Sequence, residues 1–304
     1  MDQTSNLIVR EMQKFVCKNA KDVSQVLPLP IPANTRQENR LSAGSLTSNK
    51  SLDAQHTKIL MQNLAKIHAI GYAISERNPS LFQEIATSLE TSSLLKRKLD
   101  LNNRPALIKI LEASTPLIQD HDQTIDTVKT QATELYSLHL CPLFPVITHG
   151  NLKNLTFKYN PKAEVTGVKF SSLKHSLVAC PLLDIYGAIF QSHQKEVEVH
   201  LKTYMNALHN YAANLKVSIN LNFDQIMSEF KKYELTGMIL TSLMNQKSGH
   251  VELGRSCSLG GHDMLMRNLE HRPLFELGND MGKLAIEKKI PFSHLQEDLE
   301  EESS

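Results

Sequence analysis

Most of the information in this chain lies in the segment Val146-Ile147-Thr148-His149-Gly150-Asn151-Leu152-Lys153-Asn154-Leu155-Thr156-Phe157. An apolar run leads into His-Gly-Asn, and a second apolar run follows at Leu155. Because Gly and Asn tolerate left-handed backbone conformations, this pattern predicts a tight turn between two short strands. Taken alone, His-Gly-Asn is also typical of an ordinary surface turn, so the flanking sequence has to distinguish that turn from a functional loop.

The residues that follow continue the strand pattern and then change to a helix. Asn160-Pro161 opens a polar turn, and residues 165–170 have the apolar pattern of a short strand. Further along, Pro181 opens an apolar helix that contains Asp184. The sequence therefore predicts a loop, a β-hairpin and a helix in that order.

In this order and spacing, the segments resemble the insect ecdysteroid-kinase-like family, also called choline-kinase-like, of the aminoglycoside phosphotransferase superfamily. The matching central motifs are His149-Gly150-Asn151 through Phe157-Lys158-Tyr159, Val168-Lys169-Phe170-Ser171-Ser172, and Cys180-Pro181-Leu182-Leu183-Asp184. Three further segments resemble helices of the family: Leu64-Ala65-Lys66-Ile67-His68-Ala69, Glu76-Arg77-Asn78-Pro79-Ser80-Leu81-Phe82, and residues 229–237. The resemblance spans roughly residues 51 to 245.

The departures from the family pattern fall on the residues that carry its chemistry. The resemblance implies that an Asp after His-Gly accepts the substrate's proton, and that a later Asn and a second Asp hold Mg²⁺. Here Asn151 takes the place of the base, and an amide cannot accept a proton near neutral pH. Ser172 takes the place of the metal-binding Asp, although an uncharged hydroxyl is a poor sole ligand for this cation. Asn154 matches the later Asn only if a short deletion precedes it, and the family's Trp is missing.

By this resemblance, His149, Asn151 and Asn154 form a degenerate catalytic loop, while Asn154, Ser172 and Asp184 are degenerate Mg-ATP positions. We expect His149 to organise the loop. Asp184 is expected to cap its helix or to orient the loop, with direct metal contact as the alternative.

Histidines elsewhere in the chain do not add a metal site. His68 lies on the apolar face of its predicted helix, where we expect a packed core histidine rather than a ligand. His193 and His200 lie near one face of a predicted helix, but the sequence offers no third ligand beside them. No metal site is therefore predicted.

The first 50 residues do not resemble a kinase N-lobe, which is a small sheet with a phosphate loop and a strand Lys. Residues 1–26 have the apolar spacing of a helix, and alternating prolines in 28–32 argue against a strand. Gly44 is the only glycine before Gly71, too few for a glycine-rich phosphate loop. We therefore expect the N-lobe to be largely missing, with residues 1–35 packed near the strand pair of 146–173.

The expected fold class is α+β and mostly helical: a protein-kinase-like C-lobe of the choline and aminoglycoside kinase type with a short β-hairpin at the catalytic loop. Three regions are predicted: an N-terminal remnant and linker at 1–50, the C-lobe at 51–290, and an acidic disordered tail at 291–304. Helices are expected at 53–74, 79–89, 104–118, 122–140, 181–192, 195–215, 223–246 and 262–286.

Composition narrows the functional classes. The chain has 304 residues and a formal net charge of +1, which points neither to nucleic acid nor to a charged membrane surface. It has no apolar run of about 18 residues and no signal-peptide core, so membrane insertion is not expected. The four cysteines, Cys17, Cys141, Cys180 and Cys257, fit neither a zinc site nor a dense disulfide framework, which favours a reducing, cytoplasmic setting.

The favoured interpretation is a kinase-like protein without catalysis, which binds an unknown protein partner or a small apolar ligand and needs no cofactor. Loss of a general base costs about 10²–10⁴ in rate, and loss of the metal and phosphate clamps removes the dominant electrostatic contribution. One alternative is an active phosphotransferase for an ecdysteroid-like or other hydroxyl substrate, with an atypical Mg-ATP site. The other is a truncated paralogue without function, which the sequence does not distinguish from the first interpretation.

Overall fold

The computed structural model describes residues 3–26, 44–45, 52–92, 104–114, 120–152, 155–170, 173, 175–192 and 196–245. The described helices are α1 (Gln3–Asn19), α2 (Val23–Val26), α3 (Ala54–Arg77), α4 (Pro79–Ser92), α6 (Arg104–Ser114), α7 (His121–Tyr136), α8 (Leu182–Ile189), α9 (Val197–Asn214), α10 (Phe223–Lys232) and α11 (Glu234–Asn245). The described strands are β1 (Gly44–Ser45), β2 (Val146–Thr148), β3 (Leu155–Tyr159), β4 (Val165–Phe170) and β5 (Leu177–Ala179). This mostly helical architecture with two small sheets confirms the predicted α+β class.

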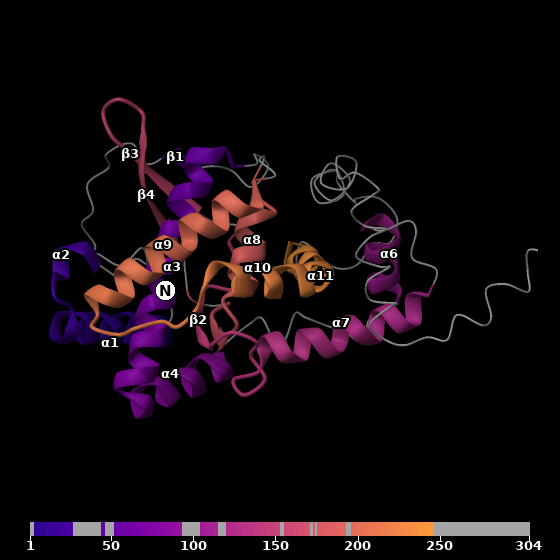
Figure 1. The fold of residues 1–304 in the computed structure, drawn as a ribbon, viewed down its shortest axis with the longest axis horizontal. Coiled ribbons are helices and arrows are strands. Elements are labelled where there is room, and N and C mark those ends of the chain that lie inside the picture. The colour runs from indigo at the N-terminus through magenta and orange to yellow at the C-terminus, as the bar shows by residue number, and fades with distance from the viewer. Residues whose placement is uncertain are drawn as a thin grey trace, which may run out of the picture.

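Helix α3 is the centre of the molecule and packs along α9, β2, β4 and α8 (Figure 1). It begins where the sequence predicts, because the side chain of Asp53 accepts the His56 N–H at its N-cap. Gly71 lets α3 lie directly against β2, since a Cβ atom there would come within 2.8 Å of the Ile147 nitrogen. Apolar residues at helical spacing on α3 are buried in the main core: Leu60, Leu64, Ile67, Ala73 and Ile74.

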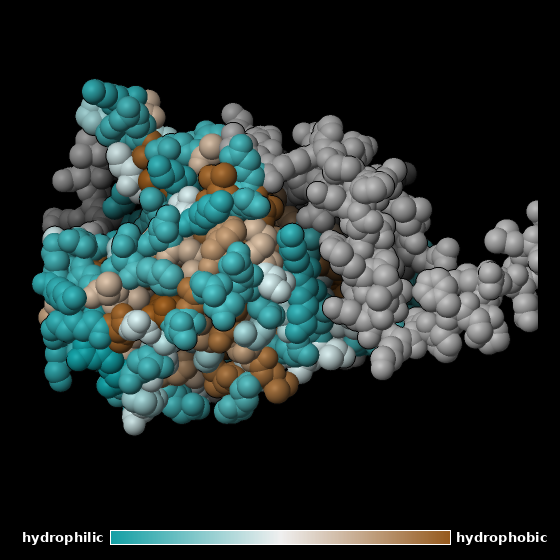
Figure 2. All heavy atoms as spheres, viewed as in Figure 1, coloured by the Kyte–Doolittle hydropathy of each residue, from teal (hydrophilic) through white to brown (hydrophobic). Residues whose placement is uncertain are grey.

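Two antiparallel sheets frame the loop after β2. Strand β2 pairs with β5, with Ile147 opposite Val178, whereas the other sheet has the order β1-β3-β4. The predicted β3–β4 hairpin is present and projects from the helical body (Figure 1), with a mostly hydrophilic tip (Figure 2). The sequence pattern does not predict strand β5, and β1 lies within the predicted N-terminal remnant and linker.

The N-terminal helices belong to the same core but not at the predicted place. Helix α1 contacts α3 and α4, and its apolar face buries Ile8, Met12 and Val16. The backbone N–H of Lys21 donates to the Asn214 carbonyl at 2.8 Å, which attaches the turn after α1 to the end of α9. The expectation that the N-terminal segment packs near the β3–β4 hairpin is thus wrong for residues 3–26, and residues 27–35 lie outside the described part.

Helices α6 and α7 extend from the body beside α11 (Figure 1). They share a second apolar cluster with α11: Leu107, Ile110, Leu111, Ile125, Val128 and Ile239.

Helix α7 ends at Tyr136, short of the predicted 140, and the predicted helix 223–246 breaks at Tyr233 into α10 and α11. The predicted helix 262–286 and the tail 291–304 lie outside the described residues. Within the described chain, no helix combines the length and apolarity that a membrane span requires.

Candidate functional site

The loop after β2 is held by a carboxylate on the neighbouring helix. Asp184, in the first turn of α8, accepts the His149 backbone N–H at 2.6 Å through Oδ2 and the Gly150 N–H at 2.9 Å through Oδ1. Gly150 has φ 75°, a left-handed conformation that favours glycine and redirects the chain directly after these two N–H groups. The two hydrogen bonds fix the direction in which the chain leaves β2.

The same carboxylate is part of a buried chain of polar side chains across three helices. His68 on α3 donates through Nε2 to Asp184 Oδ2 at 3.1 Å, since an ionised carboxylate only accepts. The other ring nitrogen of His68 lies 2.8 Å from the hydroxyl of Tyr204 on α9. The His68 and Asp184 side chains are 0% and 1% exposed, so the network joins α3, α8 and α9 to the loop in the buried interior.

The surroundings of Asp184 keep it ionised despite its burial. Burial by itself opposes the charged form, which would raise the pKa of this carboxyl. The hydrogen bond from His68, the electrostatic effects of His68 and His149, and the His149 backbone N–H outweigh that penalty. Together they hold the pKa of Asp184 below its ordinary value. A charged carboxylate is therefore the form that organises the loop.

Asp184 thus orients the loop, one of the two roles expected from the sequence, and it does not cap its helix. The N-cap of α8 is Pro181, which makes no side-chain capping hydrogen bond. His149 is 2% exposed, and its ring packs against Phe170 at 4.8 Å between centroids. His68 lies in the core, as expected.

Of the remaining predicted site residues, the structure describes only Asn151. Asn151 is half-buried at the outer end of the loop. Asn154 and Ser172, the other two degenerate Mg-ATP positions, lie outside the described residues, as does His193. The structure therefore brings His149, Asn151 and Asp184 together and leaves the remaining predicted positions as sequence predictions.

Tyr204 is a site residue that sequence reasoning missed. It lies 136 positions from His68 in the chain, so no local spacing could connect the two. Its position on the buried face of α9 marks it only as a core aromatic. The hydroxyl gains its role solely from the packing of α3 on α9.

The hollow beside the loop is very small. It is lined by Gly150, Asn151, Leu152, Leu183, Asp184, Gly187, Gln191 and Thr241, and it has a volume of about 10 Å³. This is room for about one water molecule, far below the few hundred Å³ that a ligand pocket needs. In the described structure, this hollow cannot accept a nucleotide.

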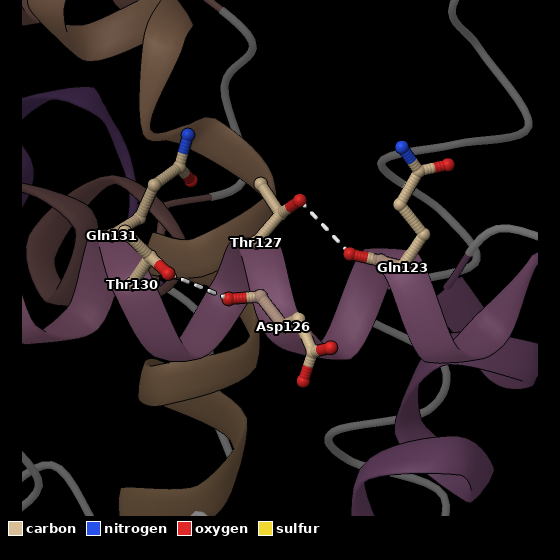
Figure 3. Close-up of a pocket in the computed structure, with 5 residues that line it drawn as sticks. All are labelled: Gln123, Asp126, Thr127, Thr130 and Gln131. Carbon is tan, nitrogen blue, oxygen red and sulfur yellow. Dashed lines mark hydrogen bonds between the residues drawn. The ribbon is translucent and has the colours of Figure 1, made fainter.

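A larger hollow of about 320 Å³ lies on α7, away from the loop (Figure 3). A single polar helix face lines it, with Gln123, Asp126, Thr127, Thr130 and Gln131. The hydroxyls of Thr127 and Thr130 donate to carbonyls of their own helix, both at 2.9 Å. Because its hydroxyls are already bonded and no catalytic group faces it, this hollow is not the candidate site despite its size.

The residues present at the loop do not fit Mg²⁺. Across the described ranges, no three or more His, Cys, Asp or Glu side chains converge as a metal site. The Asp184 oxygens already accept from two backbone N–H groups and from His68. Asn151 offers a neutral amide where the family pattern places a carboxylate. A hard dication prefers anionic oxygen ligands, so the described loop lacks the set that would bind it.

Comparisons with known proteins agree with the motif order. The model of the ecdysteroid kinase-like family matches residues 45–221, a range that includes α3, the loop, α8 and α9. Among solved structures, the chain is similar to an ethanolamine kinase from Plasmodium vivax, with 16% identity and a TM-score of 0.42 over 89% of this chain and 72% of that chain. That likeness is too distant to carry an argument. No curated protein matches the chain.

Proposed function

This chain belongs to the ecdysteroid kinase-like family, and from that membership we propose that it is a non-catalytic member whose loop supports binding or regulation. The observation that carries the proposal is Asn151 at the base position of a loop that Asp184 still holds in place. The loop is held in place by Asp184 but offers an amide where the family pattern has the proton acceptor. The missing base alone accounts for about 10²–10⁴ in rate.

The residues at the metal-binding positions also depart from the family pattern. Phosphoryl transfer relies on Mg²⁺ and cationic groups to neutralise the charge that develops on the phosphoryl oxygens. Ser172 supplies a hydroxyl where the family has a carboxylate, and Asp184 is engaged by three donors within the protein. Both features support a protein that does not assemble Mg²⁺-ATP for transfer.

The binding partner is best sought on the surface. Of the two hollows given above, one holds about a single water molecule and the other is a polar helix face. Neither resembles the enclosed apolar pocket that a small apolar ligand would occupy. The proposed partner is an unknown protein or a small apolar ligand, and the proposed role is regulatory rather than turnover.

Calorimetry with Mg²⁺-ATP tests the proposal. The purified full-length chain is titrated with ATP in the presence of Mg²⁺ and again with EDTA in its place. We expect no metal-dependent heat. A metal-dependent dissociation constant in the micromolar range, about −8 kcal/mol in binding free energy, would contradict the proposal and favour an active phosphotransferase with an atypical site.

A further inference from the structure

The N-terminal end of α3 meets strand β3 through a histidine ring. Alternate residues of a strand point to the same face, so Phe157 and Tyr159 share one face of β3. The ring of His56, in the first turn of α3, packs edge-on against both, with ring centroids 4.7 Å and 5.9 Å away. This packing brings the Tyr159 hydroxyl to His56, although 103 positions separate the two residues in the chain.

Asp53, His56 and Tyr159 form a chain of hydrogen-bonded side chains. His56 Nδ1 lies 2.7 Å from Asp53 Oδ1, and His56 Nε2 lies 3.0 Å from the Tyr159 hydroxyl oxygen. As the N-cap of α3, Asp53 also accepts the His56 backbone N–H at 2.9 Å, which holds the carboxylate in place beside the ring. A hydroxyl within reach of a base that a third group orients is the arrangement of an activated nucleophile.

The Asp53 carboxylate determines which nitrogen of His56 carries the proton. Partial burial favours the neutral acid, but the hydrogen bonds from His56 and its electrostatic effect hold the pKa of Asp53 below its ordinary value. Because an ionised carboxylate only accepts, Nδ1 of the neutral imidazole donates to Asp53 and Nε2 keeps its lone pair. The Tyr159 O–H therefore donates to Nε2, which is placed to take its proton.

A small reagent can reach this relay from solvent. The His56 and Asp53 side chains are 15% and 64% exposed, and Tyr159 is half-buried. By contrast, Tyr186 and Tyr204 are fully buried in the main core. Because the relay contains the negative charge of Asp53, an uncharged acyl donor approaches it more readily than an anionic phosphoryl donor does.

We propose that Tyr159 is a covalent modification site that takes an acyl group from a small activated ester. The Tyr159 oxygen attacks the carbonyl carbon of the ester while His56 Nε2 removes the phenol proton. The new C–O bond forms, the bond between the carbonyl carbon and the leaving oxygen breaks, and His56 gives its proton to that departing oxygen. One tyrosine and one ester give one O-acyl tyrosine and one alcohol or phenol, with no oxidation or reduction.

Acylation would act on the strand that follows the loop. An acylated oxygen has no proton to donate, so the hydrogen bond from Tyr159 to His56 is lost. That bond joins β3 to the first turn of α3, and β3 begins shortly after Asn151. An acyl group at Tyr159 therefore weakens the attachment of the β1-β3-β4 sheet to α3.

Acetylation mapping of the full-length protein tests the site. The protein is incubated with p-nitrophenyl acetate for increasing times and digested, and mass spectrometry with fragmentation separates Tyr159 from Lys158 and Lys162. Tyr72 is the internal control, a half-buried tyrosine whose hydroxyl donates to the Ser218 carbonyl at 3.3 Å rather than to a base. We expect Tyr159 to be acetylated at least about tenfold faster than Tyr72. Equal rates at the two tyrosines, or no acetyl group on Tyr159, would overturn the proposal.

Variants test the relay itself. His56→Gln removes the base and should slow acetylation of Tyr159 at least about tenfold while Tyr72 reacts as before. Asp53→Asn keeps an N-cap side chain but removes the charge, so the rate at Tyr159 should fall with little change in Tm. Asp120→Asn, at the N-cap of α7, is its matched control and should leave that rate unchanged. Undiminished acetylation of Tyr159 in folded His56→Gln would refute the relay, and if that variant fails to fold, the wild-type comparison with Tyr72 still decides the proposal.

Discussion

Asp184 is the side chain on which the loop depends most. It accepts hydrogen bonds from two backbone N–H groups and His68 at once while its side chain is buried. Removing the carboxylate would leave these donors buried without a partner. Removing the donors would leave a buried charge that nothing compensates.

Asp184→Asn should lower the free energy of unfolding by about 3 kcal/mol at pH 7, because one oxygen becomes an NH₂ group that faces a donor. Urea denaturation measures this change. Asp126→Asn, at an exposed position on α7, is the matched control and should stay within about 0.5 kcal/mol of wild type. Equal stability of the two variants would show that the Asp184 network does not hold the loop.

The lowered pKa of Asp184 also predicts how stability depends on pH. A depressed carboxyl pKa adds stability above the unfolded value of 3.8 and loses it as the pH falls toward the folded value. The gap between wild type and Asp184→Asn should therefore be constant from pH 7 to about 5 and narrow below 3.8. A gap that widens in acid would contradict the assigned ionisation.

The sequence predicts the roles of single residues better than it predicts the hydrogen bonds between residues far apart in the chain. The sequence predicted that Asp184 caps its helix or orients the loop, of which the structure has the second, and that His68 is a core residue. It could not join them, because they lie 116 positions apart and meet only through helix packing. Tyr204 carries no motif at all, so nothing short of the packed structure could assign it to the site.

Among the elements, α8 is fixed from both sides by close contacts. Besides the loop on one side, Tyr186 donates its hydroxyl to the Phe230 carbonyl at 2.6 Å and lies against Gly237 of α11. A Cβ atom at Gly237 would overlap the Tyr186 ring. The junction of α10 and α11 is therefore shaped around one buried aromatic side chain.

Gly237→Ala should destabilise the protein by about 2 kcal/mol, because overpacking a tight helix contact outweighs the better helix propensity of alanine. The matched control is Gly167→Ala on β4, where the nearest side-chain atom is 3.9 Å from the new Cβ and the change should be near zero. Thermal and urea denaturation report both. An unchanged Gly237→Ala protein would mean that α8 and α11 are not in close contact.

The sequence located helices better than it located short strands and helix breaks. Strand β5 has three residues, too few for alternation to identify, and β1 has two. The break at Tyr233 interrupts a continuous apolar pattern, so the period alone predicts one helix where the structure has α10 and α11. The start of α3 agrees with the predicted helix 53–74, because the side chain of Asp53 caps the helix and sets this boundary locally.

At the scale of the whole molecule, the N-terminal helix is part of the main core. Ile8, Met12 and Val16 are buried together with residues of α3 and α4. The sequence predicted the helix from its apolar spacing but misplaced it, since a helix pattern shows which face is apolar and not which surface receives it. Whether the N-lobe of the family is missing stays a prediction.

A variant lacking residues 1–50 should aggregate or bind a hydrophobic dye, because the apolar surface under α1 is uncovered. A variant lacking 291–304, the predicted acidic tail, is the control and should behave as wild type. Size-exclusion chromatography and dye fluorescence compare the three proteins. A shortened protein as soluble, monomeric and stable as wild type would mean that α1 is dispensable.

The central proposal is that the loop held by Asp184 does not catalyse phosphoryl transfer. The most direct measurement is ADP formation from Mg²⁺-ATP by the wild type and by Asn151→Asp, against a protein-free blank. We predict the blank rate for both, because restoring one member of a set of cooperating groups gains little. ADP formation above the blank by either protein would contradict the claim.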